Sequence, residues 1–453
     1  MNIVIMGCGK VGSELALTLT GDGHSVAVID KLHKALEQGS EELDVLTGEG
    51  DGVDTSVLRE AGIESADVFI AVSASDELNI LASLIAKQIS NVETIARVRN
   101  PIYYRETGAS LGKMGITKVI NPERLAAGDI YSLLTYPALS RVDFFAGGEG
   151  MIFTLHCRGE YGFAGRTLKD VRAEASSRVL ACAVARKGQV FVPGGSFVIE
   201  PDDEVTFVTT VSELPEFFGE HNIKNDPAQD VLITGGGAIG WYLTEILLDK
   251  HKNVRIIEAN EERCLALSEE FPKAEVIHGD GTDGRFLMKQ GLKNADAFVA
   301  LTGIDEENII TANFAKDKAG NKVIAKVSRT DLRQVIESLD IDSAVFPKVV
   351  CADAIARYIR AWNRGAGTRL EAFFRYMGKL VEITELRVVE GDPGISVPLK
   401  NLKLKDNLIL AGIEHEGVFS IPSGNSAYTA GDLVVVVTLH KGISSLKDIM
   451  AWT

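Results

Sequence analysis

The sequence predicts an α/β protein built as a tandem duplication, in which each half is a Rossmann-like parallel-sheet lobe followed by a small β-rich α+β lobe. Three observations predict this fold class. Short apolar strands alternate with helical stretches at the start of each half, which is typical of right-handed βαβ units and a parallel sheet. A glycine pattern follows the first strand of each half, "GCGKVG" at 7–12 and "GGGAIG" at 235–240. The second pattern lies 228 residues after the first.

The duplication extends beyond the glycine patterns. Residues 51–87 align with 280–316 at an offset of 229, with 15 identities in 37 positions, where unrelated sequence would give about two. The match resumes between "KGQVFVPGG" at 187–195 and "EGVFSIPSG" at 416–424. The sequence therefore predicts four domains: Rossmann lobes at 1–136 and 228–363, and β-rich regulatory lobes at 137–219 and 370–453.

The strands of the first Rossmann lobe are predicted from short runs rich in β-branched residues, namely "NIVIM", "SVAVID", "LDVLTG", "DVFIAV" and "TIARV". The second lobe repeats them as "DVLITG", "NVRIIE", "AEVIHG", "AFVALT" and "VIAKVS". From about 148 to 211 and from 378 to 440, helical spacing gives way to short strands broken by turn residues. Apolar helices are predicted at 123–136 and 351–363, either as hinge and dimer contacts or as ordinary core-facing helices. The polar stretch 220–230 is the predicted linker.

Composition limits the function classes. The formal net charge is −16, and a surface that acidic disfavours nucleic acid as a ligand. No apolar run reaches the length of a membrane-spanning helix, and no secretory signal is expected. The five scattered cysteines lack C-x-x-C spacing, which argues against disulfides or a zinc site and fits a reducing cytoplasm. Cys8, inside the first glycine loop, is interpreted as a small residue filling a tight turn rather than as a reactive thiol.

The glycine loops predict nucleotide binding. The first glycine makes a tight turn, the second clears space for a pyrophosphate, and the third packs the helix on the strand, so that the helix N-terminus offers free N–H groups to phosphate. An acid at the end of each second strand can accept both ribose hydroxyls and repels a 2′-phosphate, which favours NAD(H) or an adenine nucleotide over NADP. These acids are Asp30 and Glu258. The alternative is a pair of empty Rossmann folds kept as scaffolds.

Further positions near the loops are candidates. Asp51 and Asp280 follow the third strands and are expected to brace that turn rather than to contact a ligand. Ser73 and Thr302 end the fourth strands, at the sheet edge where ligands bind in such folds. Arg97 and Arg99 end the fifth strand, and strand alternation predicts that one of them faces away. The second half offers Lys326 and Arg329 as a looser match.

An enzyme is the less favoured interpretation. The eight histidines form no metal-binding spacing, and no nucleophile motif or Walker lysine loop is present. The lobe after each Rossmann unit is too small to supply much of a substrate cleft. An NAD-dependent oxidoreductase acting on a small molecule remains the alternative.

The combined motifs resemble the regulator-of-potassium-conductance domains. The resemblance rests on the glycine loop, the strand-end acid, "ADVFIAV", "ARVRNP" and "INPERLAA", followed by a small β lobe. Two such units in one chain are similar to the cytoplasmic subunits of Trk-type potassium uptake systems. The resemblance implies a non-catalytic regulator that binds NAD(H) and ATP or ADP. It also implies a tetramer forming a ring of eight domains, peripheral on the inner face of the membrane, that gates an integral-membrane potassium-translocating partner.

The resemblance also implies site residues. In the first half they are Gly7, Cys8, Gly9, Lys10, Val11, Gly12, Asp30, Asp51, Ser73 and Arg97. In the second half they are Gly235, Gly237, Ala238, Ile239, Gly240, Glu258, Asp280 and Thr302. Glu123 matches a carboxylate that faces a divalent cation in related rings, although an acid in the first turn of a helix is also favoured by the helix dipole alone. Ala238 and Lys348 replace Lys10 and Glu123 in the second half. The first site is therefore expected to suit a triphosphate, and the second NAD(H), AMP or nothing.

Overall fold

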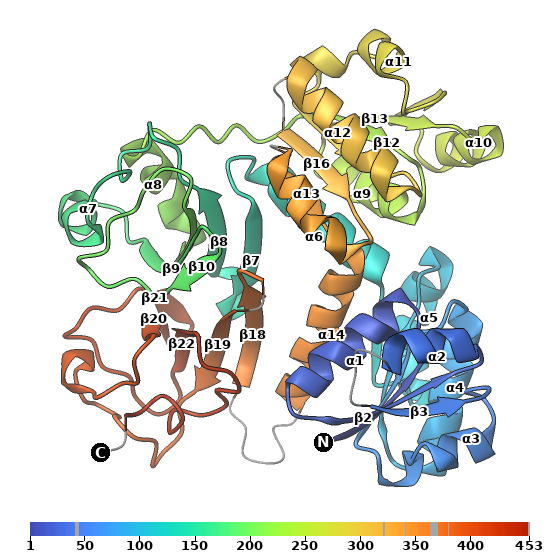
Figure 1. Ribbon diagram of the computed structural model, residues 1–453, viewed down its shortest axis with the longest axis horizontal. Helices are drawn as coiled ribbons and strands as arrows, with labels where there is room; N and C mark the ends of the chain where they lie inside the picture. The colour runs from blue at the N-terminus through green and yellow to red at the C-terminus, as the bar shows by residue number, and fades with distance from the viewer. Residues whose placement is uncertain (41–44, 320–321, 340, 363–369, 379, 452–453) are drawn as a thin grey trace. The chain divides into compact units, whose positions relative to one another are not determined.

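The computed structural model describes residues 1–40, 45–319, 322–339, 341–362, 370–378 and 380–451. The chain forms two compact units, each made from both halves of the sequence. Unit 1 contains Met1–Leu134 and Ala228–Ala356, and unit 2 contains Thr135–Pro227 and Arg357–Thr453 (Figure 1). The two Rossmann lobes thus share one unit and the two β lobes share the other.

Each Rossmann lobe is a six-stranded parallel sheet. The first sheet has the order β3-β2-β1-β4-β5-β6 and the second β14-β13-β12-β15-β16-β17, so the two copies have the same topology. The first sheet comprises β1 (Asn2–Met6), β2 (Ser25–Asp30), β3 (Leu46–Glu49), β4 (Val68–Ala71), β5 (Glu93–Arg97) and β6 (Lys118–Ile120). The second comprises β12 (Asp230–Thr234), β13 (Asn253–Glu258), β14 (Glu275–His278), β15 (Ala297–Ala300), β16 (Lys322–Lys326) and β17 (Ser343–Val345). The strand order reverses beside β1 and β12, and a ligand crevice is expected at this switch point.

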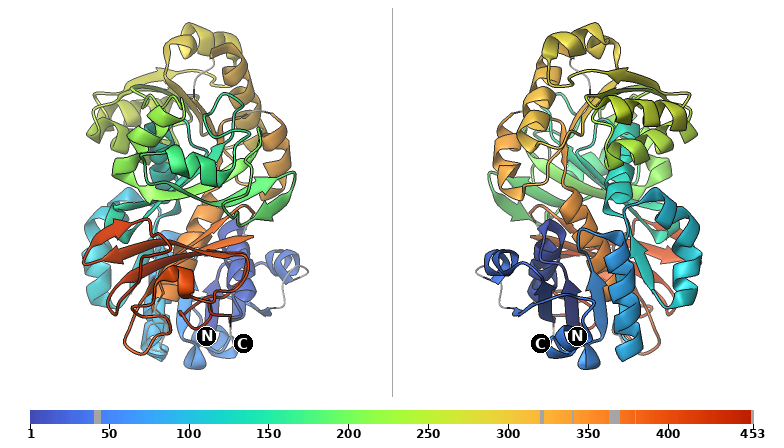
Figure 2. Two further views of the ribbon diagram at one scale, coloured as in Figure 1. Left: turned by 90° about the vertical axis from the view of Figure 1, so that its left-hand side faces the viewer. Right: turned by 90° about the vertical axis from the view of Figure 1, so that its right-hand side faces the viewer.

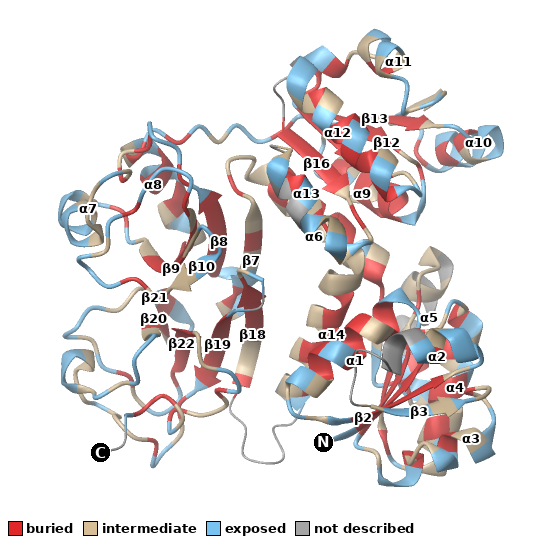
Figure 3. Ribbon diagram, in the orientation of Figure 1, coloured by how far each residue is buried: buried red, intermediate tan, exposed pale blue. Residues whose placement is uncertain are grey.

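The helices follow the strands in the expected alternation, with the strands buried and the outer helix faces exposed (Figure 3). The first lobe has α1 (Lys10–Gly21), α2 (His33–Ser40), α3 (Thr55–Glu60), α4 (Asp76–Ile89), α5 (Pro101–Met114) and α6 (Pro122–Thr135). The second has α9 (Ala238–Asp249), α10 (Glu261–Glu270), α11 (Gly284–Lys289), α12 (Asp305–Ala319), α13 (Arg333–Ser338) and α14 (Pro347–Trp362).

Each β lobe is a five-stranded antiparallel sheet, with orders β10-β9-β11-β8-β7 and β18-β19-β22-β20-β21 (Figure 2). The first has β7 (Arg141–Phe145), β8 (Gly150–His156), β9 (Leu180–Arg186), β10 (Gln189–Phe191) and β11 (Glu204–Thr210), with α7 (Leu168–Glu174) and α8 (Leu214–Glu220). The second has β18 (Leu370–Tyr376), β19 (Val381–Arg387), β20 (Leu408–His415), β21 (Val418–Ser420) and β22 (Leu433–Thr438). The predicted fold class is confirmed.

The structure corrects several element boundaries. Each Rossmann sheet has a sixth strand of three residues, β6 or β17, which is too short to show a periodic pattern. Strands β7 and β18 begin the β lobes before the change of composition at 148 and 378. Helix α14 begins at Pro347, four residues before the predicted start, because proline is well tolerated in the first turn of a helix. Residue 363, its predicted end, lies outside the described residues. No regular element occupies 221–229 within the predicted linker.

The α6 helix packs against the second Rossmann lobe. Its buried residues Ala126, Ala127 and Ile130 belong to the same hydrophobic core as Val231 and Trp241 of the second lobe. The reciprocal helix α14 brings buried Cys351 close enough to Arg97 and Glu123 of the first lobe for their charges to affect its thiol. Both apolar helices therefore contact the opposite lobe of the same chain, which fits both interpretations of these segments.

Candidate functional site

Each Rossmann lobe presents a glycine loop between its first strand and the next helix. Gly7 and Gly235 have φ values of +105° and +99°, a region that favours glycine. A Cβ atom added to Gly12 would lie 1.8 Å from the carbonyl oxygen of Gly7, and at Gly240 the corresponding distance is 2.4 Å. The first and third glycines are thus required by the backbone itself, as the sequence predicts.

The middle glycines leave the space that a ligand would need. A Cβ at Gly9 or at Gly237 would meet no atom within 4 Å. These glycines are the N-caps of α1 and α9, and neither cap supplies a side chain to the first helical N–H groups. Each helix therefore offers free N–H donors and its positive dipole end at an open position, which is the arrangement that binds phosphate. Val11 and Ile239, in the first turn of each helix, are buried and anchor it to the sheet.

The strand-end acids brace the glycine loops. One oxygen of Asp30 accepts the Cys8 N–H at 2.7 Å, and the other accepts the Leu32 N–H at 2.9 Å. Glu258 does the same in the second half, accepting from Gly236 at 2.7 Å and Asn260 at 2.9 Å. A carboxylate has about four lone-pair sites, so each acid retains the capacity to accept ribose hydroxyls.

Cys8 is a buried thiol within the first loop. Its sulfur lies 3.9 Å from the Ser13 hydroxyl. Burial raises the pKa of Cys8, with the charge of Asp30 adding to the rise, so the reactive thiolate is disfavoured. The structure supports the interpretation of Cys8 as a residue that fills a tight turn.

Asp51 and Asp280 each accept hydrogen bonds from the turn in which they lie. Asp51 accepts the Val53 N–H at 3.2 Å and lies 2.8 Å from the Lys31 ammonium. Asp280 accepts both the N–H and the hydroxyl of Thr282, at 2.8 and 2.7 Å. The hydrogen bond from Lys31 lowers the pKa of Asp51, and the bonds from Thr282 lower that of Asp280. Both carboxylates act as turn braces in this structure.

A buried asparagine, which was not predicted from the sequence, links two strand ends at the carboxyl edge of each Rossmann sheet. The Asn79 side chain accepts from the Ser73 N–H at 2.8 Å and donates to the Arg97 carbonyl at 2.9 Å. Asn308 makes the matching bonds to the Thr302 N–H at 2.8 Å and the Lys326 carbonyl at 3.0 Å. Each asparagine ties the ends of the fourth and fifth strands together. Identity at the repeat offset is the signal in the sequence that marks both residues.

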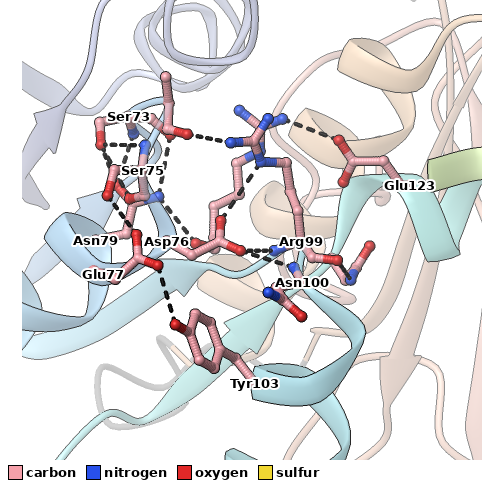
Figure 4. A network of polar contacts seen from close by, with 12 residues as sticks. Ser73, Ser75, Asp76, Glu77, Asn79, Arg99, Asn100, Tyr103 and Glu123 are labelled. Carbon is pink, nitrogen blue, oxygen red and sulfur yellow. Dashed lines mark hydrogen bonds and ion pairs between the residues drawn. The ribbon is translucent and has the colours of Figure 1, made fainter. Parts of the chain in front are cut away.

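A buried aspartate fixes the next turn in the same way. One oxygen of Asp76 accepts the N–H groups of Arg99 and Asn100, at 2.9 and 2.7 Å (Figure 4). Asp305 accepts those of Ser328 and Arg329, each at 2.9 Å. The carboxyl edge of each sheet is therefore built from a repeated asparagine and aspartate pair, which positions the residues around it.

Arg97 and Glu123 form an ion pair at the first sheet edge. Their side chains are 15% and 16% exposed, and the guanidinium lies 3.2 Å from Glu123 Oε1. Arg99 contacts the Ala74 carbonyl and Asp76 instead. Strand alternation is not the reason for this difference, because residues two apart on a strand share a face and Arg99 lies beyond the end of β5. Glu123 Oε2 is buried and has no partner among the described residues. In that part of the chain no three acidic, histidine or cysteine side chains gather around a metal position.

The second sheet edge carries different charges. Lys326, one repeat after Arg97, donates to the Thr302 carbonyl at 2.7 Å. Burial lowers the pKa of Lys326, Asp305 opposes that effect, and the nearby charge of Lys10 adds to it. Lys348 lies 3.7 Å from Glu14, which is buried on α1. The α1 helix and Lys10 of the first lobe thus face the strand ends of the second lobe.

The reciprocal contact joins α9 to the first lobe. The Tyr242 hydroxyl donates to the Arg99 carbonyl at 3.0 Å and accepts from Asn121 at 2.7 Å. Tyr242 lies 228 residues after Glu14, so the two contacts are related by the duplication. Each glycine-loop helix therefore lies against the sheet edge of the other lobe.

These features define the class of protein: a duplicated Rossmann protein with one dinucleotide-type glycine loop in each half and the two loops on a shared junction. The TrkA-N domain family model matches residues 3–122 and 231–347, and the TrkA-C domain model matches 160–220. The chain belongs to the family of Trk potassium uptake proteins, with two TrkA-N domains. Its fold is similar to that of a solved regulator-of-potassium-conductance (RCK) domain.

Relatives and solved structures agree with this assignment. The chain is 30% identical to the Trk system potassium uptake protein TrkA homolog of Archaeoglobus fulgidus, over 99% of this chain and 100% of that protein. It is 30% identical to TrkA of Haemophilus influenzae, over 80% of this chain and 79% of that protein. The crystal structure of the GsuK RCK domain has a TM-score of 0.63 at 18% identity, covering 96% of this chain and 92% of that one. The GsuK channel bound to NAD has a TM-score of 0.63 at 18% identity, covering 96% and 76%.

Proposed function

We propose that this chain is a non-catalytic regulatory subunit that binds NAD(H) and ATP or ADP and thereby gates an integral-membrane potassium-translocating partner. The family membership supports potassium uptake as the process. The observation that carries the regulatory mechanism is the placement of each glycine-loop helix against the sheet edge of the other lobe. A nucleotide in either loop would lie at the junction of the two lobes.

This placement gives a nucleotide a way to act on the protein. A ligand shifts a conformational equilibrium only by the difference between its affinities for the two conformations. A ligand that contacts both lobes can bind with different affinities when the lobes change position relative to each other. Four chains assembled as a tetramer would supply a ring of eight RCK domains, peripheral on the inner face of the membrane. Within the described residues no helix is long and apolar enough to span a bilayer.

The charges at the two junctions favour different ligands. Lys10 lies close enough to Lys326 at the second sheet edge for their charges to interact, and Lys348 pairs with Glu14. At the first edge Arg97 is neutralised by Glu123, and the loop residue of α9 that corresponds to Lys10 is Ala238. The surplus positive charge therefore supports a polyphosphate, ATP or ADP, in the second lobe and NAD(H) in the first. This assignment reverses the expectation from sequence, because Lys10 faces the opposite lobe.

Replacing Lys10 with alanine tests the assignment. In a chain whose first site is removed by D30A, K10A is expected to weaken ATP binding about tenfold, equivalent to about 1.4 kcal/mol, and to leave AMP binding unchanged. The loss should shrink at high salt, because the lysine acts through its charge. Isothermal titration calorimetry measures both effects. In the E258A background, where only the first site remains, K10A should have no effect. A loss of ATP affinity there, with none in D30A, would assign Lys10 to its own loop.

The regulatory function requires a flux measurement. NAD, NADH, ATP and ADP are added to liposomes that contain the membrane partner and the full chain, and potassium flux is recorded. We expect at least one nucleotide to change the flux, and the change to disappear in the D30A/E258A double variant. Nucleotide binding without any change in flux would exclude the gating function. Turnover of NADH with a small substrate would instead favour an oxidoreductase.

A further inference from the structure

Glu385 is a buried acid at the contact between the two β lobes of unit 2. It lies in the middle of β19, where it pairs with Ala372 of β18 and Val435 of β22, and is 6% exposed. Paired residues in antiparallel strands share a sheet face. Ala372 and Val435 belong to a hydrophobic core that also contains Ile152 and Val208 of the first β lobe. The Glu385 carboxyl group therefore faces the core that joins the two lobes.

At the position in the first lobe that corresponds to Glu385, two neutral side chains share a hydrogen bond. In the first lobe the Cys157 N–H donates to the Asp203 carbonyl at 2.7 Å, and in the second the Val388 N–H donates to the Asp432 carbonyl at 2.8 Å. Cys157 and Val388 therefore occupy corresponding positions in the two lobes. Three residues earlier in each strand stand Thr154 and Glu385. Thr154 shares a hydrogen bond of 3.0 Å with the hydroxyl of Thr206, its partner across the sheet. Glu385 faces Val435 instead, and its Oε1 has no hydrogen-bond partner among the described residues.

The surroundings of Glu385 disfavour its charged form. Burial raises the pKa of Glu385 to about 7, and the like charges of Glu414 on β20 and Glu371 on β18 contribute to the rise. A backbone hydrogen bond from Ala146, in the turn η2 (Ala146–Gly148) of the first lobe, and the charge of Arg387 on β19 act in the opposite direction. Glu382, another buried acid on the same strand, has a partner for each oxygen: Arg375 at 3.5 Å and the Gly442 N–H at 3.0 Å. The Oε1 atom of Glu385 has none among the described residues.

We propose that Glu385 is a proton-dependent contact between the two β lobes: its neutral form packs in the shared core, and its ionisation loosens that core. A carboxylate in a largely apolar core, with one oxygen lacking a hydrogen-bond partner, has a large desolvation cost, whereas the protonated acid has a much smaller one. The carboxyl group becomes ionised without strain only if water enters between the lobes. This inference concerns the packing of unit 2 and does not depend on nucleotide binding.

The sign of the pH dependence follows from linkage. The folded-state pKa lies above the ordinary value of a glutamate, so the stabilisation is complete below about pH 4.3 and is lost as pH rises through about 7. Between pH 6 and pH 8 the equilibrium constant for local opening of the shared core is therefore expected to rise about tenfold on account of Glu385. The other pH-sensitive groups of the lobe, His415 among them, contribute equally to wild type and to a Glu385 variant and cancel in the comparison.

Hydrogen exchange on the full chain tests this proposal. Opening constants for the amides of β8 and β19 are measured from pH 6 to 8 and corrected for the pH dependence of intrinsic exchange, in wild type and in E385Q. The glutamine keeps the size and polarity of the protonated acid but cannot ionise. We expect the tenfold rise in wild type to be absent in E385Q, whatever the absolute stability of the variant.

A second variant comes from the duplication itself. The E385T/V435T double substitution places in the second lobe the threonine pair that the first lobe already has, and it should also remove the tenfold rise. The E414Q variant should keep a rise that is shifted to lower pH, because one like charge beside Glu385 is gone. If E385Q shows the same increase in opening between pH 6 and 8 as wild type, the proposal is wrong.

Discussion

Replacing Asp30 with alanine should remove nucleotide binding from the first Rossmann lobe, and replacing Glu258 should remove it from the second. Each substitution removes the proposed acceptor of the ribose hydroxyls, together with one bond to the glycine loop and one to the turn after the second strand. A hydrogen bond to a charged group contributes about 1.5–3 kcal/mol, so an affinity loss of about tenfold to more than a hundredfold is expected at the altered site. Calorimetry with NAD and ATP should show the binding stoichiometry fall by one site in each single variant.

The selectivity of the sites gives an independent readout. Because a carboxylate repels a 2′-phosphate, wild type should prefer NAD to NADP, and D30A should lose that preference along with its affinity for NAD. The D249A variant is a suitable control, since Asp249 ends α9 at the far end from the glycine loop and its side chain is 73% exposed. Unchanged stoichiometry in both D30A and E258A would show that these acids do not bind ribose.

Replacing Asn308 with alanine should strongly destabilise the second Rossmann lobe. The substitution removes the Asn308 bonds to the Thr302 N–H and the Lys326 carbonyl, both at a partly buried sheet edge. It also removes one of the two donors to the Thr302 carbonyl, which keeps its bond from Lys326. Each buried backbone group left without a partner costs about 1–3 kcal/mol. Denaturant unfolding and hydrogen exchange at residues 297–304 should therefore both report a large loss of stability.

The neighbouring asparagine provides the control for this experiment. Asn313 lies on the same helix five residues later and is exposed, so N313A should change stability by less than about 0.5 kcal/mol. The N79A variant should reproduce the effect in the first lobe, where Asn79 also bonds the Ser73 hydroxyl. Equal stabilities for N308A and N313A would contradict the assigned role.

The sequence predicts most of the fold because the decisive features are local. The glycine loops are recognisable because Gly7 and Gly235 need a positive φ and because Gly12 and Gly240 exclude any side chain. The three-residue strands β6 and β17 carry too little pattern to be recognised. Asn79 and Asn308 recur at the repeat offset, but polar residues on helices usually face solvent, and only the tertiary structure shows them buried.

The direction of Lys10 illustrates what a sequence pattern does not contain. Its place in the glycine loop indicates that it serves a phosphate, and the loop alone suggests its own lobe. Which lobe it faces depends on how α1 packs against the second half, a contact between residues more than three hundred positions apart. The same holds for α6, whose apolar residues indicate a packed helix without identifying the sheet that it covers.

The covalent link between the two Rossmann lobes has an evolutionary consequence. In a symmetric homodimer the same residue occupies both copies of every contact, so a substitution on one side is imposed on the other. Joining two copies in one chain removes that constraint, and each position can then drift or specialise separately. Glu14 facing Lys348 and Tyr242 facing Arg99 and Asn121 are such diverged contacts at equivalent places. If both loops bind nucleotides as proposed, the two sites of a single polypeptide can therefore differ in the ligand that they select.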